Sequence, residues 1–110
     1  LNRIAVDKRG LGDFNGAVDS DLKAIAVQFE IARLDPKNEQ SRLDLASYQQ
    51  SLAETYVKLG QIPDAAELFA KAFAVYEDSL KRNPEDAEVA EAMDSVRRSL
   101  QKIRTTSKAL

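Results

Sequence analysis

The feature that most constrains this chain is an internal repeat at an offset of 48 residues. The same residue recurs at that offset at many positions: Ala5/Ala53, Leu11/Leu59, Gly12/Gly60, Ala17/Ala65, Lys23/Lys71, Ala24/Ala72, Val27/Val75, Pro36/Pro84, Ser47/Ser95, Ser51/Ser99 and Leu52/Leu100. A period between about 20 and 50 residues is typical of stacked repeats, in which each unit needs its neighbours to cover its apolar face. The sequence therefore predicts an array of similar units.

The composition indicates that these units are helical. Ala, Leu, Glu, Gln, Lys and Arg favour helix and dominate the chain, while only 6% of the residues are aromatic. Gly and Pro are few and cluster between long uninterrupted stretches. We therefore predict an all-α fold with about five helices, at residues 1–8, 14–34, 37–59, 63–81 and 85–104.

Apolar spacing and breakers define these helices. Apolar residues three or four positions apart predict the buried stripes. The stripe of the 14–34 helix is Phe14, Val18, Leu22, Ile25, Phe29 and Ala32, and that of the 85–104 helix is Val89, Met93, Val96, Leu100 and Ile103. Gly60 should end one helix, and Pro63 fits the first turn of the next. Asp35 and Asn83 are predicted N-caps, each followed by a proline in the first helical position.

The residue types present exclude much enzymology. The chain has no His and no Cys, so it lacks thiolate nucleophiles, disulfides, His-dependent triads and the zinc sites built on those ligands. Asp13, Asn15, Asp19 and Asp21 resemble a calcium loop only superficially, because Ala24 stands where the bidentate Glu would be needed. We therefore expect no enzyme activity, no catalytic residue, no metal and no cofactor.

Charge and hydropathy point to a soluble chain. Sixteen basic and eighteen acidic residues give a net charge of −2. No apolar run approaches the roughly 18–20 residues that a membrane span needs, and we expect a cytoplasmic protein with no membrane partner. The chain begins at Leu1 instead of Met, which we interpret as a piece of something longer.

The sequence resembles a known family, the tetratricopeptide repeats. Their W-x2-L-G-x2-Y…A-x3-F…P pattern corresponds here to Gln49, Leu52, Ala53, Tyr56, Ala65, Phe69, Ala72 and Pro84. The spacings from Leu52 to Ala72 match the family, and Pro84 falls seven residues later than the family pattern puts it. Leu1, Ile4, Ala5, Ala17, Ala24 and Pro36 form a weaker copy, with Lys8 and Asp21 where aromatics are expected. Gln49 replaces the first large aromatic residue, which is one departure from the family.

The other departure is the period, which exceeds the usual value of about 34 residues. Seven extra residues in each helix add roughly two turns and nearly preserve the direction of its buried stripe. The chain is thus similar to long-helix variants such as those of kinesin light chains and bacterial signalling proteins. The resemblance implies antiparallel helix pairs stacked in a right-handed superhelix. Its units would be residues 1–36, truncated at the N-terminus, 37–84, and 85–110 as a third-unit or capping helix.

The resemblance also implies a concave groove lined by the first helix of each unit. The groove positions of the family fall on Asn2, Val6, Arg9, Ser47, Gln50, Glu54, Val57, Lys58, Ser95, Arg98, Lys102 and Thr105. Asn2 and Val6 stand where chaperone-tail binders have Lys and Asn, so we expect no binding of that type. The implied function is a non-catalytic module, within a larger protein, that binds a peptide or helix of a partner protein.

The final helix has a one-sided charge pattern. Arg97, Arg98, Lys102, Arg104 and Lys108 are basic, and no acidic residue lies among them. This run either complements the dipole at a helix C-terminus or attracts an acidic partner. Nucleic acid is not expected, because the chain is acidic overall and no aromatic residue accompanies the run for base stacking.

Self-association remains an alternative function. The predicted 1–8 helix is too short to cover the 14–34 helix, which should therefore keep an exposed apolar strip. The stripe of the 85–104 helix follows a heptad-like step that could pair with a second copy. Dimerisation or domain swapping through exposed stripes of the first and last helices is thus the competing hypothesis.

Overall fold

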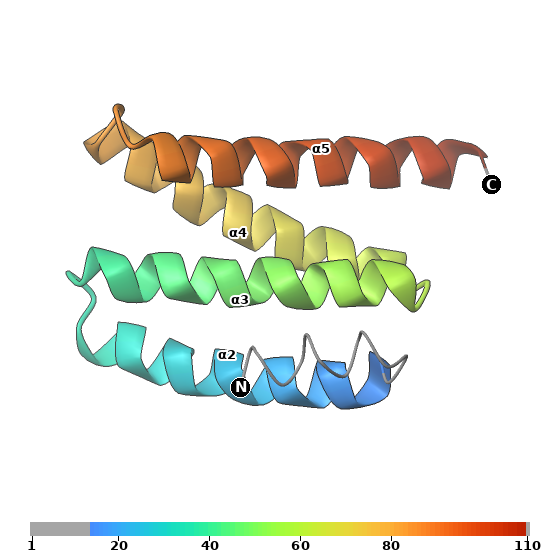
Figure 1. Cartoon of the computed structure of the whole chain (residues 1–110), viewed down its shortest axis with the longest axis horizontal. Helices are drawn as coiled ribbons and strands as arrows, with labels where there is room; N and C mark the ends of the chain where they lie inside the picture. The colour runs from blue at the N-terminus through green and yellow to red at the C-terminus, as the bar shows by residue number, and fades with distance from the viewer. Residues whose placement is uncertain (1–13, 110) are drawn as a thin grey trace.

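The computed structural model of the protein describes the backbone of residues 14–109 and the side chains of residues 16–105. Within those residues the chain forms four α-helices and no strands: α2 (Phe14–Leu34), α3 (Glu39–Lys58), α4 (Ile62–Arg82) and α5 (Ala87–Ala109). Consecutive helices pack against each other and run in opposite directions (Figure 1). The all-α prediction is confirmed for this part of the chain. The predicted 1–8 helix lies outside it.

The helix boundaries confirm one prediction and correct others. The 14–34 helix has the predicted limits, whereas α3 begins at Glu39 and α5 at Ala87, each two residues later than predicted. Helix α5 also continues past Arg104 to Ala109. The predicted N-caps Asp35 and Asn83 are wrong, and the reason lies in the turns that follow them.

Two equivalent turns connect α2 to α3 and α4 to α5. The Asn38 amide donates to the Asp35 carbonyl at 3.0 Å, and the Asp86 amide donates to the Asn83 carbonyl at 3.2 Å. Each proline is therefore the second residue of a tight turn, a position that suits its fixed φ and missing N–H. The turn delays the helix by two residues, so Asn38 and Asp86 become the caps. Their side chains accept from the Ser41 amide at 3.1 Å and the Val89 amide at 3.2 Å.

We predict that removing either cap costs stability. Asn38→Ala or Asp86→Ala leaves a first-turn N–H without its partner and should lower the free energy of unfolding by about 1 kcal/mol. Urea denaturation followed by circular dichroism measures this loss. Glu85→Ala, an exposed change in one of the same turns, is the control and should be nearly neutral. Equal losses in all three variants would contradict the capping role.

The end of α3 follows the prediction for Gly60. Gly60 has a φ of 78°, the left-handed region that glycine adopts without strain. The Gly60 amide donates to the Val57 carbonyl at 3.1 Å and the Gln61 amide to the Tyr56 carbonyl at 2.9 Å, the pair of bonds of a Schellman motif. Pro63 then lies in the first turn of α4, as predicted.

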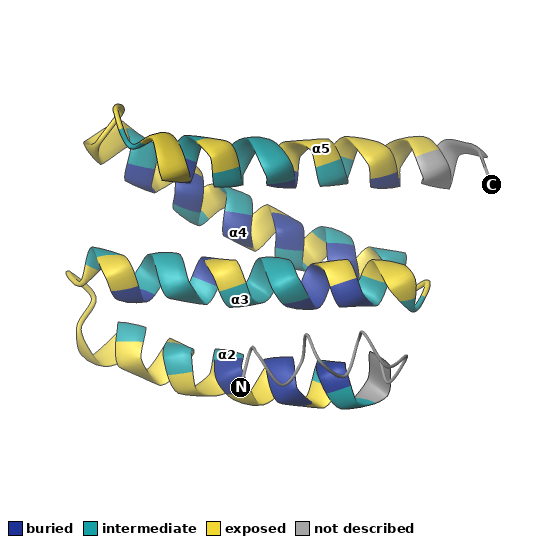
Figure 2. Cartoon of the chain, viewed as in Figure 1, coloured by how far each residue is buried: buried dark blue, intermediate teal, exposed yellow. Residues whose placement is uncertain are grey.

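The core lies around α4 and is rich in alanine. Ala46, Ala53, Ala65 and Ala72 are fully buried, and they pack in one cluster with Phe69, Tyr76, Val89, Val96 and Ile103. Figure 2 shows buried residues along most of α4. Leu52, Ala53, Ala65, Phe69 and Ala72 are all buried. Five of the eight residues that carry the family resemblance thus lie in the protein interior.

The predicted stripe of α5 is part of this core. Val89, Val96 and Ile103 are buried, and Met93 and Leu100 pack partly buried against the same cluster. The suggestion that this stripe is exposed for pairing with a second copy is therefore wrong, because α5 turns it toward α4.

The predicted stripe of α2 requires a different correction. Leu22 and Phe29 are 47% and 55% exposed, so the prediction that they are buried is wrong. The buried residues of α2 are Ala17, Ser20, Asp21 and Ala24. Helix α2 packs against α3, and its Gln28 side chain donates to the Ser41 carbonyl of α3 at 3.2 Å. The expected exposed apolar surface on α2 is confirmed, but helix geometry places it on two sides. Leu22 and Phe29 lie on one side, and Val27, Ile31 and Leu34, which we call the α2 apolar strip, lie on the other.

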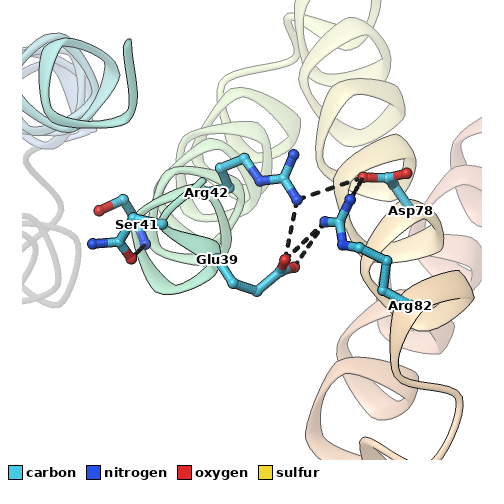
Figure 3. Close-up of polar contacts among 6 residues, drawn as sticks. Glu39, Ser41, Arg42, Asp78 and Arg82 are labelled. Carbon is cyan, nitrogen blue, oxygen red and sulfur yellow. Dashed lines mark hydrogen bonds and ion pairs between the residues drawn. The ribbon is translucent and has the colours of Figure 1, made fainter. Parts of the chain in front are cut away.

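A four-residue ionic network joins the start of α3 to the end of α4 (Figure 3). Arg82 contacts the Glu39 carboxylate at 2.8 Å and Asp78 at 2.7 Å. Arg42 contacts Glu39 at 3.1 Å and Asp78 at 3.6 Å. Exposed pairs contribute little singly, but several charges in one network hold a fixed geometry more effectively. The network therefore aligns α3 with α4.

Candidate functional site

A groove runs between α3 and α5, with α4 beneath it. Helices α3 and α5 point in the same direction and α4 is drawn between them (Figure 1). Residues of all three helices line two open cavities of about 370 and 280 Å³. The larger lies toward the C-terminal ends of α3 and α5, and we call it the C-terminal cavity. The smaller lies toward their N-terminal ends and is called the N-terminal cavity.

The C-terminal cavity has an apolar base and a charged rim. Its apolar lining comes from all three helices: Val57, Ile62, Phe69 and Ile103. Its polar lining is Glu54, Lys58, Ser99 and Lys102. Two lysines on facing helices thus flank a space that can take an apolar side chain.

The N-terminal cavity has the opposite charge. Asp44 of α3 and Asp86 and Glu88 at the start of α5 contribute three carboxylates. Leu43, Val89, Ala92 and Tyr76 form the apolar part, and Gln40 and Ser47 complete the lining. No Lys or Arg lines this cavity within the described part of the chain.

A hydrogen-bonded bridge crosses the groove through Gln50. The Tyr76 hydroxyl of α4 donates to Gln50 Oε1 at 3.2 Å, and Gln50 Nε2 donates to Ser95 Oγ of α5 at 3.4 Å. One side chain of α3 therefore connects to both neighbouring helices at the level of the groove.

The structure brings most of the predicted groove residues together. Glu54, Val57, Lys58 and Lys102 line the C-terminal cavity, Ser47 lines the N-terminal cavity, and Gln50 and Ser95 form the bridge. Arg98 lines neither cavity and instead contacts Asp94 at 3.0 Å. The Thr105 hydroxyl donates a hydrogen bond to the Gln101 carbonyl of its own helix. Asn2, Val6 and Arg9 lie outside the described residues.

Sequence reasoning missed the floor and the acidic end of the groove. Phe69 and Tyr76 come from α4, a second helix of a pair, whereas only first helices were considered. Their place in the apolar stripe of α4 was the available signal. Asp86 and Glu88 were not among the predicted groove residues. Their position beside Asp44 is a tertiary contact that no sequence spacing indicates.

The environment of Tyr76 shifts its titration. Burial, followed by the negative charge of Glu54, raises the pKa of the Tyr76 hydroxyl above its ordinary value. Both causes disfavour the phenolate in the folded protein. A raised folded pKa means that the unfolded chain loses this proton first as the pH increases. The stabilisation is therefore complete below the unfolded pKa of about 10 and is lost as the pH rises from there through the folded value.

We accordingly predict a specific alkaline sensitivity. The stability of the parent chain should fall above about pH 10, and Tyr76→Phe should show a smaller fall because the titrating proton is absent. Urea unfolding at a series of alkaline pH values, with parallel ultraviolet titration of tyrosinate, measures both. Identical pH profiles for the parent and Tyr76→Phe would contradict the assignment.

The described residues contain few alternative centres. No cluster of three or more Asp and Glu side chains suited to a metal ion occurs in the part of the chain that the structure describes. Asp19 pairs with Lys23 at 3.2 Å on the exposed side of α2, while Asp21 is fully buried, so these two carboxylates do not converge. None of the described helices is long and apolar enough to cross a membrane.

Comparison with known proteins matches part of the chain to one family. Residues 45–86, which cover most of α3, all of α4 and the cap of α5, match the family model for the tetratricopeptide repeat. The match supports a relationship to that family, whose members are generally non-enzymatic modules that bind proteins or peptides. A search of curated proteins found no match.

Proposed function

We propose that this chain is a non-catalytic module of a larger, cytoplasmic protein, and that it binds a segment of a partner protein in the groove between α3 and α5. The observation that carries the proposal is the C-terminal cavity. It joins an apolar base to two facing lysines at positions where the resemblance places the family's ligand groove. Concave repeat surfaces of this kind hold extended peptides or helices.

The architecture that goes with this function is a long-helix tetratricopeptide array. The equivalent turns at 35–38 and 83–86, with the same cap geometry, support a 48-residue unit. The parallel course of α3 and α5 supports their role as the first helices of successive units in a right-handed superhelix. The 14–34 helix then closes the first unit, and α5 opens the third unit or caps the array.

A groove variant tests the function. Lys58→Glu combined with Lys102→Glu leaves three carboxylates at the C-terminal cavity, the two new ones and Glu54. These repel an acidic group of the ligand, so the variant should abolish capture of a partner from native lysate. Arg98, although a predicted groove residue, is left unchanged because it lines neither cavity. Capture is measured by pull-down and mass spectrometry with the parent chain alongside.

A second candidate function is self-association through α2. The observation that favours it is the α2 apolar strip, in which Val27, Ile31 and Leu34 are 56%, 43% and 72% exposed. Val27→Ser with Ile31→Ser is therefore the matched control in the same pull-down. If the control loses the partner and the lysine variant keeps it, the groove proposal is wrong. Light scattering across concentration shows directly whether the strip joins two copies.

A further inference from the structure

We infer that the groove takes an extended partner segment in one charge order. An apolar side chain of the segment enters the C-terminal cavity, an acidic group lies beside Lys58 and Lys102, and a basic group lies at Asp44, Asp86 and Glu88. The inference rests on the proposed function and deepens it, because it states the chemistry of the segment and not only its location.

The bridge at Gln50 excludes a helical ligand from the floor of the groove. Gln50 of α3 reaches Ser95 of α5 with 3.4 Å between nitrogen and oxygen, so two side chains close the groove midway along its length. A helix with its side chains is about 10–12 Å across and cannot pass between α3 and α5 at that level. An extended chain can cross above the bridge and direct side chains into the cavities on either side.

The C-terminal cavity selects an apolar residue next to an acid. Val57, Ile62, Phe69 and Ile103 provide a base without charge. Lys58 and Lys102 stand exposed at its rim, and Lys58 forms no ion pair with any residue of the described range. An acid of the ligand that follows the apolar anchor therefore meets two cations from facing helices and one carboxylate, Glu54, so the rim keeps a net positive charge.

The N-terminal cavity selects the opposite charge. Asp44 accepts a hydrogen bond from Gln40 at 2.9 Å, and Asp86 caps α5. Among the described residues, Asp44, Asp86 and Glu88 form no ion pair with a Lys or Arg. Three carboxylates without a cation repel an acidic ligand and attract a basic one. A uniformly acidic segment, one of the options left open by the sequence, therefore suits only half of the groove.

The two ends are far enough apart to read separate residues. Asp44 and Lys58 lie on one helix, about 21 Å apart at 1.5 Å per residue. An extended segment covers that length with about six residues at roughly 3.3 Å each. This separation between the two ends exceeds the screening length of about 8–10 Å at physiological salt, so each end acts on its own part of the ligand.

The test uses three synthetic peptides with blocked termini and one leucine anchor. The first has two Lys at one end and two Glu beyond the anchor, about six residues away; the second has the same residues with Lys and Glu alternating; the third has Glu at both ends. Binding is followed by amide chemical shifts of the isotope-labelled protein. The first peptide should bind about five- to ten-fold more tightly than the other two, with shifts at both cavities, and the preference should shrink at high salt.

Two protein variants separate the ends. Asp44→Asn with Glu88→Gln keeps the Asp86 cap and should remove the preference for the basic end, so that the first and third peptides bind equally. Lys58→Glu with Lys102→Glu should weaken both of those peptides. If the three peptides bind the parent groove equally, the charge order is wrong while groove binding stands. If none of them shifts a groove residue at millimolar concentration, the proposed function itself is contradicted.

Discussion

Phe69→Ala is expected to lower the free energy of unfolding by about 3–5 kcal/mol, the usual cost of truncating a buried aromatic residue. Phe69 is the largest of the fully buried side chains, with 1% of its surface exposed. Its ring packs in the cluster that joins α3, α4 and α5, so truncation leaves a cavity that the surrounding helices fill only partly. A small domain has about 5–15 kcal/mol in total, and this variant should be close to unfolding at body temperature.

The matched control is the same substitution at an exposed position. Phe29 is 55% exposed on α2, and Phe29→Ala should change stability by about 0.5 kcal/mol or less. Chemical denaturation of both variants and the parent, followed by circular dichroism, measures the difference. Equal losses at the two positions would contradict the placement of Phe69 in the interior and of Phe29 at the surface.

The second large effect concerns a small residue. Ala72 is fully buried on α4 within the central cluster, and Ala72→Leu adds three carbon atoms where no space exists. Overpacking of this kind forces side chains off their rotamers or moves the backbone, at a cost of about 1–3 kcal/mol and occasionally more. We expect a lower denaturation midpoint together with disturbed amide shifts on α3 and α5.

Ala74→Leu controls for the chemistry of the change. Ala74 lies two residues away on the exposed side of the same helix, and Ala and Leu have nearly equal helix propensity. This variant should therefore keep the parent stability. A stable Ala72→Leu chain would show that the helices pack less closely than the fully buried alanines indicate.

The charge order of the groove has a simple physical origin. Acidic residues stabilise the positive end of a helix and basic residues its negative end. Asp86 and Glu88 lie at the start of α5, and Lys58 lies at the end of α3. Because α3 and α5 run in the same direction, their acidic starts share one end of the groove, and Lys58 at the end of α3 lies at the same end as the basic C-terminal half of α5. The dipole and ligand interpretations of the basic run on the last helix are therefore compatible.

Much of the fold could be predicted from local pattern. Helix type, the stop at Gly60 and the interior positions of Leu52, Phe69 and Val96 follow from helical spacing and breaker residues alone. The errors occurred where a turn or a neighbouring helix decides. Pro36 and Pro84 fit either a first helical turn or a tight turn, and both lie in tight turns. Helix α2 buries Ala17 and Ala24, whereas Leu22 and Phe29 are exposed.

The candidate site was predicted in part for the same reason. Glu54, Val57, Lys58 and Lys102 were identified through a family resemblance, and the structure places them around one cavity. Asp44 and Asp86 were not identified, because a cavity between helices depends on which residues of different elements meet. The periodicity of residues along one helix does not indicate which residues of another helix lie beside it.

The sequence by itself determined the helices, their order, most of their ends and the residues of the α4 core, because these depend on interactions within a few turns of the chain. The tertiary structure alone decided which face of α2 is buried, where the bridge at Gln50 crosses and how two opposite charges come to lie at the two ends of one groove. Those features depend on the distance and direction between helices far apart in the sequence, which close packing sets only when the whole core is assembled.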